Sequence, residues 1–194
     1  MIDLVNECER MEISHSELIC NFDCGDHDLN DFFNRDALLF QNERLGKTFF
    51  LRHKQTKKVV CAFSLSADSV KTFLLTNNRR KKVRELVPHE KSLQSYPAML
   101  IGRLGVSTEF SKQGIGSQLL EFIKEFCYDK FKHYVRFLIV DAYNKPDVLH
   151  YYEKNDFKFL FISEEDERQN LKKSINRDRP LYSRQMFFDL KRYE

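Results

Sequence analysis

The 194-residue sequence contains no tryptophan, only six glycines and four prolines, and no repeat or low-complexity tract. Its five cysteines are an odd, scattered set, which does not indicate the disulfide framework of a small secreted domain. No apolar run approaches the roughly 18 residues that a membrane span needs. The first residues also lack the basic and apolar regions of a secretory signal. We therefore expect a cytoplasmic protein with free thiols and no membrane segment.

A strong charge of either sign is also missing, because 32 Lys and Arg residues are balanced by 29 Asp and Glu residues. The net charge of +3 does not demand a nucleic-acid partner, so the location of the charge matters more than its sum. Aromatic side chains are abundant, with 18 Phe and 8 Tyr in a chain that is 42% hydrophobic. This length and composition predict a globular protein with a large core.

The cysteines do not predict a metal site or a catalytic thiol. Cys20, Cys24 and His27 lie close together in the sequence, but their spacing matches no standard zinc pattern and no fourth ligand is evident. Cys61 lies in an apolar strand pattern and Cys127 in a helical one, so we expect both in the core. No base or orienting group is evident for a nucleophilic cysteine, so we expect no metal and no thiol chemistry.

Hydrophobic spacing predicts a helix and then a β-hairpin in the first part of the chain. Apolar residues recur at helical spacing after Asp28, which we expect to cap a helix that ends near Gly46. A stretch before this helix is mixed and contains a short strand at most. Residues 47–52 and 59–65 are apolar with a polar turn between them, which predicts an antiparallel hairpin.

The second half of the chain alternates strand and helix patterns after residues 71–96, which have no clear period and end at Pro97. The predicted order is strand, helix, strand, helix, strand, strand, at residues 98–106, 114–127, 134–140, 146–154, 156–162 and 184–190. Strand–helix–strand connections imply parallel neighbours, whereas the hairpin is antiparallel. We therefore predict a single α/β domain over residues 1–194, with a mixed sheet of about six to seven strands flanked by helices.

A glycine-rich loop opens the helix that begins at residue 114. Gly114 and Gly116 stand where the backbone N–H groups and the macrodipole of a helix favour an anion. Polar neighbours can add hydrogen bonds or charge: Ser111, Lys112, Ser117 and Gln118. By itself such a pair of glycines is more often a packing turn. A Walker loop and a dinucleotide fingerprint are excluded, because Ser117 stands where Lys is required and a third glycine is missing.

At this loop the sequence resembles the GNAT acetyltransferase family, whose pattern is Arg/Gln-x-x-Gly-x-Gly/Ala between a strand and a helix. Gly114 and Gly116 match its glycines, whereas Ser111 stands where Arg or Gln is usual. Residues 140–144 and 149–157 resemble the later strand, asparagine and tyrosine-bearing helix of the family, with an aspartate where glycine is usual. The resemblance implies the GNAT fold, with splayed central parallel strands. Residues 71–96 then form a basic insertion.

The resemblance also implies that acetyl-CoA is the cosubstrate. Its pantetheine arm pairs with the strand before the loop, and its pyrophosphate lies on the amides at the helix start. The residues implied to bind it are Leu104, Gly105, Val106, Ser111, Lys112, Gln113, Gly114, Ile115, Gly116, Ser117, Asn144 and Tyr151. No acidic residue lies in the strand 98–106 to serve as a base.

Two residues match the family's catalytic positions. Tyr152 matches the tyrosine that protonates the leaving thiolate, and Asn144 can orient the cofactor or the substrate. Tyr151 is the alternative proton donor, and His150 is a weaker candidate for a base. From spacing alone, Tyr152 is more readily a buried aromatic of its helix, so its role comes from the resemblance.

The acceptor is expected to be a primary amine of a small molecule or a protein. A first alternative is the amino group of aminoacyl-tRNA, because residues 22–33 and 102–106 resemble a GNAT subgroup found in bacterial toxin–antitoxin pairs. The basic run 79–84 then either contacts phosphates or forms a solvated surface. A second alternative is a module that binds acyl-CoA or a partner without turnover, since Ser111 and Asp156 depart from the family pattern. Separately, we expect Phe187 and Phe188 to be exposed and to favour a homodimer.

Overall fold

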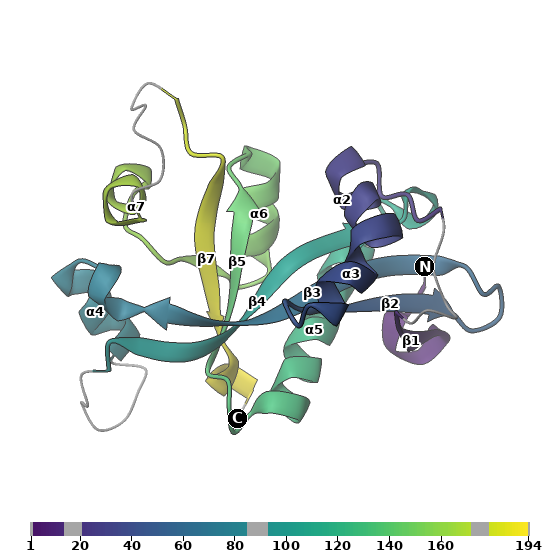
Figure 1. Cartoon of the computed structure of the whole chain (residues 1–194), viewed down its shortest axis with the longest axis horizontal. Coiled ribbons are helices and arrows are strands. Elements are labelled where there is room, and N and C mark those ends of the chain that lie inside the picture. The colour runs from purple at the N-terminus through teal and green to yellow at the C-terminus, as the bar shows by residue number, and fades with distance from the viewer. Residues whose placement is uncertain (1, 14–20, 85–92, 172–178, 194) are drawn as a thin grey trace. The chain divides into compact units, whose positions relative to one another are not determined.

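Seven strands form one sheet in the order β1-β2-β3-β4-β5-β7-β6, and helices flank it (Figure 1). The computed structural model describes residues 2–13, 21–84, 93–171 and 179–193. The mixed α/β sheet confirms the predicted fold class and the predicted number of strands.

The chain divides into two compact units. The first holds residues 1–67 and 101–126, and the second holds residues 68–100 and 127–194. The single domain with a basic insertion stays a prediction, as does the splay of the two central strands.

The first unit contains an antiparallel set of strands. β1 (Cys8–Glu12) pairs with β2 (Lys47–His53), and β2 pairs with β3 (Val59–Lys71). The predicted hairpin is therefore confirmed, and Phe49 and Phe63 face each other across it with ring centroids 5.1 Å apart. β3 extends well beyond the apolar run that predicted it. Strand pairing satisfies the backbone whether or not the side chains are apolar, so the apolar pattern marks only the buried part of a strand.

The predicted helix after residue 28 is wrong in its cap and in its continuity. It consists of α2 (His27–Asp31), a π-helical turn (Phe32–Asp36) and α3 (Ala37–Asn42), and α3 lies beside β2 (Figure 1). The cap is Asp26, whose extended backbone lets its carboxylate accept the Leu29 N–H at 3.1 Å. Because a π turn keeps the helical direction, hydrophobic spacing does not reveal it.

β4 (Ser95–Val106) starts earlier than predicted and includes Pro97, which therefore does not end the preceding segment. The Pro97 carbonyl still accepts the Arg136 N–H at 3.0 Å, so the residue pairs through the one backbone group that it retains. In the first unit β4 packs against the chain before α2. A Cβ added at Gly105 would lie 3.1 Å from both Cβ and Sγ of Cys24.

We expect Gly105→Ala to lower the free energy of unfolding by about 1 to 3 kcal/mol, the usual cost of overpacking. Cys24 cannot retreat easily, because its N–H donates to Asn30 Oδ1 at 2.9 Å and the Asp23 carbonyl accepts from Thr108 N at 2.9 Å. Urea denaturation measures the change.

The matched control for this prediction is Gly102→Ala in the same strand. A Cβ there meets only the Ser64 hydroxyl oxygen, at 3.2 Å, and that hydroxyl can rotate away. Equal loss in the two variants would contradict the close-packing argument.

The second unit begins with the stretch that shows no period in the sequence. Residues 72–74 form a 3-10 turn, and the basic run lies in α4 (Asn77–Arg84). Arg80 ties the helix to this turn, since its Nε donates to the Thr72 carbonyl at 2.9 Å and its Nη2 to the Leu75 carbonyl at 3.1 Å. The later part of the stretch, residues 85–92, lies outside the described residues.

β5 (Phe137–Tyr143) begins later than predicted, and α6 (Pro146–Lys154) has the predicted bounds. The predicted strand 156–162 shortens to β6 (Lys158–Phe159), because only a few residues pair with β7 (Ser183–Asp189) before the chain enters α7 (Glu164–Leu171). The strand–helix–strand path from β4 to β5, neighbours in the sheet, is the crossover that parallel strands require.

The expectation that Phe187 and Phe188 are exposed is wrong. They keep 6% and 4% of their accessible surface, because Phe187 packs on Phe137 and Phe188 packs on Phe157. Both faces of β7 are covered within the chain, so these two residues give no support to a homodimer. Cys61 and Cys127 are buried in the core, as predicted.

Candidate functional site

The glycine-rich loop of the first unit folds as an irregular backbone turn. A 3-10 turn (Thr108–Phe110) follows β4, and α5 (Ile115–Phe131) begins after Gly114. Lys112 and Gly114 both have left-handed backbones, with φ of +60° and +76°. Left-handed residues between extended and helical ones turn successive N–H groups toward one side of the loop. An added Cβ at Gly114 meets nothing within 4 Å, so its glycine is required by conformation rather than by space.

Several backbone donors at this turn have no acceptor among the described residues. Within the part of the chain that the structure describes, the amides of Gln113, Ile115 and Ser117 donate to no acceptor. The first four N–H groups of a helix have no partner within it, and α5 is long enough for a full macrodipole. The loop therefore offers an anion several backbone donors at a positive helix end.

Some side chains around the loop hydrogen-bond the protein itself, whereas others can reach a ligand. Ser111 Oγ donates to the Thr108 carbonyl at 3.0 Å, so this hydroxyl proton stabilises the loop itself. The amide of Gln118 bonds the N-terminal segment, accepting from Leu4 N at 3.0 Å and donating to the Ile2 carbonyl at 3.0 Å. Gln118 is thus an anchor and not a ligand group. Lys112 is exposed and forms no ion pair with a described residue.

The end of the strand before the loop lies in the same unit as the loop. Leu104 and Val106 are half-buried, and Gly105 between them is covered by Cys24. The guanidinium of Arg103 lies 3.8 Å above the Phe32 ring of the π turn. The two segments that resemble the toxin-associated subgroup therefore contact each other in the folded chain.

Helix α6 of the second unit carries the two tyrosines. Pro146 occupies its first turn, where a missing N–H costs nothing and the fixed φ of proline suits a helix. Tyr152 keeps 7% of its accessible surface and packs edge-on against Phe157, at 5.5 Å between centroids. Tyr151 is half-buried, and its ring centroid lies 5.0 Å from that of Tyr152.

Burial raises the pKa of the Tyr152 phenol, because the phenolate loses its solvation. The hydroxyl therefore stays protonated at every pH at which the protein would normally work. A neutral phenol can donate a hydrogen bond, and then its proton, to a thiolate that forms beside it.

The turn after α6 explains a departure from the family pattern. Asp156, which stands where glycine is usual, has a left-handed backbone with φ of +65°. Aspartate tolerates this conformation better than most residues. The turn is therefore kept, at some strain, without glycine.

Asn144 lies directly after β5 and is held on several sides. Its backbone N–H donates to the Tyr182 carbonyl at 3.0 Å, and its side-chain Nδ2 donates to Glu164 Oε2 at 3.0 Å and to the Leu181 carbonyl at 2.9 Å. Both amide hydrogens are thus committed, so a contact to the cofactor would use the amide oxygen.

Glu164 is the acceptor that fixes Asn144. Burial raises its pKa, but hydrogen bonds from Leu181 N and Asn144, with the charges of Arg184 and Arg168, outweigh burial and leave the pKa lowered. The carboxylate is ionised at neutral pH and holds Asn144 in one orientation. The sequence does not reveal this link, because Glu164 is an ordinary acidic residue of a polar stretch.

Among the described residues, no group of three His, Cys, Asp or Glu side chains could hold a metal ion. Cys24 instead donates its Sγ hydrogen to Asn30 Oδ1 at 3.2 Å. Cys20 lies outside the described residues. None of the helices in the described ranges combines the length and the hydrophobicity that a membrane crossing requires.

Comparison with known proteins gives one matching family and several solved structures of similar fold. Residues 73–159, which include both the glycine-rich loop and Tyr152, match the family described as "Acetyltransferase (GNAT) domain". The fold is similar to that of a Tyr-to-Phe variant of KacT, at 17% identity and a TM-score of 0.68, covering 96% of this chain and 97% of that chain.

Two AtaT structures are also similar to this chain. AtaT complexed with acetyl-methionyl-tRNAfMet is 15% identical with a TM-score of 0.67, over 96% of this chain and 97% of that chain. AtaTR bound with acetyl-CoA is 14% identical with a TM-score of 0.65, over 96% of each chain. At these identities the likeness establishes the shared fold.

Proposed function

Because this chain carries a GNAT acetyltransferase domain and is an acetyl-CoA-dependent acyltransferase, we propose that it acetylates a primary amine of a small molecule or a protein. The observation that carries this proposal is the loop before α5. Its left-handed Lys112 and Gly114 and its unused amides at Gln113, Ile115 and Ser117 suit a diphosphate. Acetyl-CoA is the cosubstrate that brings such a group.

The reaction is direct attack of the neutral amine nitrogen on the thioester carbonyl carbon. The C–S bond breaks, the thiolate of CoA leaves, and the amide nitrogen loses its extra proton to water. We assign the protonation of the thiolate to Tyr152, whose buried phenol is protonated at neutral pH, donates its proton as the C–S bond breaks and regains one from water. Asn144 orients the cofactor or the substrate through its amide oxygen. Tyr151 stays the alternative donor.

A second acceptor, the amino group of aminoacyl-tRNA, is supported by the first unit. Residues 22–33 and 102–106 contact each other through Gly105 with Cys24 and Arg103 with Phe32. A structure of similar fold is an AtaT complex with acetyl-methionyl-tRNAfMet. An aminoacyl ester lowers the pKa of its amine, so this acceptor needs no base from the enzyme.

We further propose that the protein works in the cytoplasm. That it forms a homodimer is also a proposal.

The test is release of free thiol from acetyl-CoA over a panel of small amines, peptides and charged tRNA. We expect thiol release with one class of acceptor only, and growth arrest on expression if that class is charged tRNA. A chain that binds acetyl-CoA by calorimetry but releases thiol with no acceptor would contradict the enzymatic proposal. That outcome would favour the non-catalytic module.

A further inference from the structure

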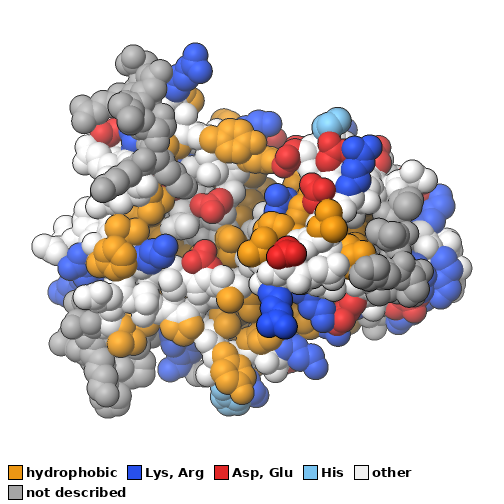
Figure 2. Space-filling view, viewed as in Figure 1, with side chains coloured by type: hydrophobic (Ala, Val, Ile, Leu, Met, Phe, Trp, Pro, Cys, Tyr) orange, Lys and Arg blue, Asp and Glu red, His pale blue; other side chains and the backbone are white. Residues whose placement is uncertain are grey.

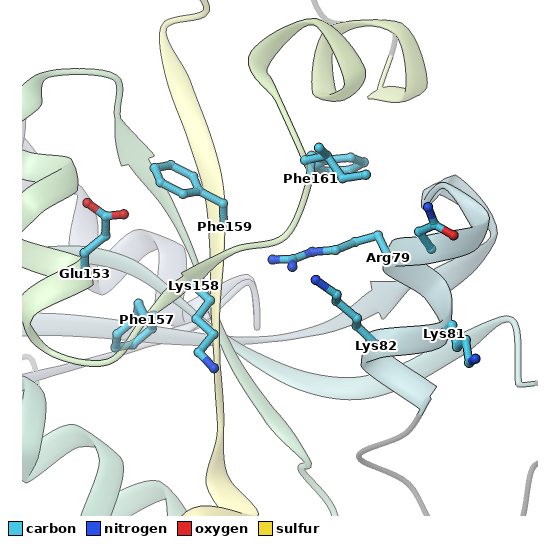
Figure 3. A pocket seen from close by; sticks show the side chains of 10 residues that line it. Arg79, Lys81, Lys82, Glu153, Phe157, Lys158, Phe159 and Phe161 are labelled. Atoms are coloured by element: carbon cyan, nitrogen blue, oxygen red, sulfur yellow. The ribbon is translucent and has the colours of Figure 1, made fainter.

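A pocket of about 830 Å³ lies in the second unit, between α4 and the segment around β6. Figure 3 shows Arg79 and Lys82 extending from α4 toward this segment, where Lys158 and Phe159 lie. Its volume is in the range of small-molecule sites, roughly 300–1,000 Å³. Phe157 of its lining packs against Tyr152, but the charged lining residues have no role in the proposed acetyl transfer.

The charges of the pocket are mostly positive, and few of them are compensated by a described residue. Four cations, Arg79, Lys81, Lys82 and Lys158, line it together with one carboxylate, Glu153. The three lysines are exposed and form no ion pair with any described residue. On the face shown in Figure 2, Lys and Arg side chains lie among hydrophobic ones around α4. Unpaired cations around a concave surface attract a multivalent anion.

Arg79 differs from the lysines because the protein holds it in place. Its Nε donates to the Leu160 carbonyl at 2.9 Å, and its guanidinium lies 5.8 Å from the Phe187 ring centroid. Burial lowers its pKa, although a guanidinium stays charged. Its remaining N–H groups bond no described residue, so they form a pre-oriented donor set.

One wall of the pocket is apolar and aromatic. Its side chains are Phe157, Phe159, Phe161 and Ile162. Phe157 and Phe161 are buried, whereas Ile162 keeps 62% of its accessible surface. The Arg184 guanidinium lies 4.8 Å from the Phe159 centroid and supports that ring. A planar apolar group can pack on this wall while its anionic part meets the cations.

We infer that this pocket binds a nucleotide, with its phosphate on Arg79, Lys82 and Lys158 and its base against Phe159 and Ile162. Lysine side chains and a fixed guanidinium are the usual partners of phosphate oxygens, and aromatic side chains are the usual partners of bases. A free nucleotide and a nucleotide within a single RNA strand present this same chemistry. The inference does not depend on the proposed acetyl transfer.

The test measures binding of ATP and of a short single-stranded RNA in the presence of saturating CoA, so that the adenosine site of the cofactor is occupied. We expect Lys82→Glu with Lys158→Glu to weaken binding about 100-fold, from roughly tenfold for each charged hydrogen bond. The control is Lys130→Glu, another exposed lysine of the second unit, which should bind like the wild type. Acetyl-CoA affinity should be the same in all variants.

The outcomes separate the sources of the ligand. Tight ATP binding that is lost in the double variant supports a free nucleotide, and binding of RNA alone supports a nucleotide within a chain. Equal binding of inorganic pyrophosphate and ATP overturns the inference, because the apolar wall then contributes nothing. No binding, or an equal loss in Lys130→Glu, overturns it as well. If the wild type binds no nucleotide while its thiol release persists, only this inference fails.

Discussion

Tyr152→Phe is expected to lower kcat for acetyl transfer by about 10²- to 10⁴-fold, the usual contribution of a positioned general acid. The phenylalanine ring keeps the edge-on contacts to Phe157 and Tyr151, so acetyl-CoA should bind with unchanged affinity. Assays of thiol release give kcat, and calorimetry gives the affinity for acetyl-CoA. Because the hydroxyl acts only on the leaving thiolate, the loss should appear in kcat and not in KM for the cofactor.

The control for this variant is Tyr151→Phe, which removes the hydroxyl of the alternative donor. We expect it to retain activity within a few-fold of the wild type. A wild-type kcat in Tyr152→Phe would show that Tyr152 is not the proton donor. A large loss of kcat in Tyr151→Phe would make Tyr151 the donor.

The raised pKa of Tyr152 adds a dependence of stability on pH. The folded protein holds this proton more tightly than the unfolded chain, where the pKa is about 10. Its stabilising contribution is therefore complete below about pH 10 and declines as the pH rises further. Wild type should lose more unfolding free energy than Tyr152→Phe between pH 8 and pH 11, in denaturant titrations. Equal losses of unfolding free energy in the two proteins would indicate that the Tyr152 phenol is exposed.

Gly114→Asp is expected to weaken acetyl-CoA binding by about tenfold or more relative to Gly114→Asn, because its charge repels the diphosphate at short range. Both side chains have nearly the same size, and both residue types tolerate the left-handed backbone that Gly114 adopts. No atom lies within 4 Å of the added Cβ in either case. The comparison therefore isolates charge from shape.

Calorimetry at two salt concentrations measures this difference. The difference in acetyl-CoA affinity between the two variants should decrease as the salt concentration rises, because the loop is exposed and salt screens its charge. A second control, Ser111→Ala, should bind almost normally if its hydroxyl serves the loop carbonyl of Thr108 as the structure indicates. Equal affinities of the aspartate and asparagine variants would place the diphosphate elsewhere.

Sequence patterns predicted the elements that have strong local signals. The hairpin of β2 and β3 and helix α6 follow from apolar runs, a polar turn and Pro146, all of which act within a few residues. The glycine-rich loop could also be predicted from the sequence, because Gly114 permits a left-handed turn that few other residues accept. The family and the fold class followed from these segments, and the family match and the sheet confirm them.

Other features depend on contacts between residues that lie far apart in the chain. Phe187 and Phe188 look exposed in a short strand pattern, yet both are covered by distant aromatic rings. Asn144 is held by Glu164 and Leu181, and no spacing rule links these positions. The pocket of Arg79 and Lys158 requires α4 and the β6 segment to come together, although the sequence shows only a basic run.

By itself the sequence determined the chemistry that depends on backbone conformation and local order: a left-handed glycine turn at a helix start, a tyrosine on the later helix, and the alternation of strands and helices. Only the tertiary structure decided which side chains are available. Burial, long-range hydrogen bonds and the pairing of charges are properties of neighbours in space. For that reason Gln118 is an anchor, Tyr152 is a neutral buried phenol, and three lysines around a pocket have no ion pair with a described residue.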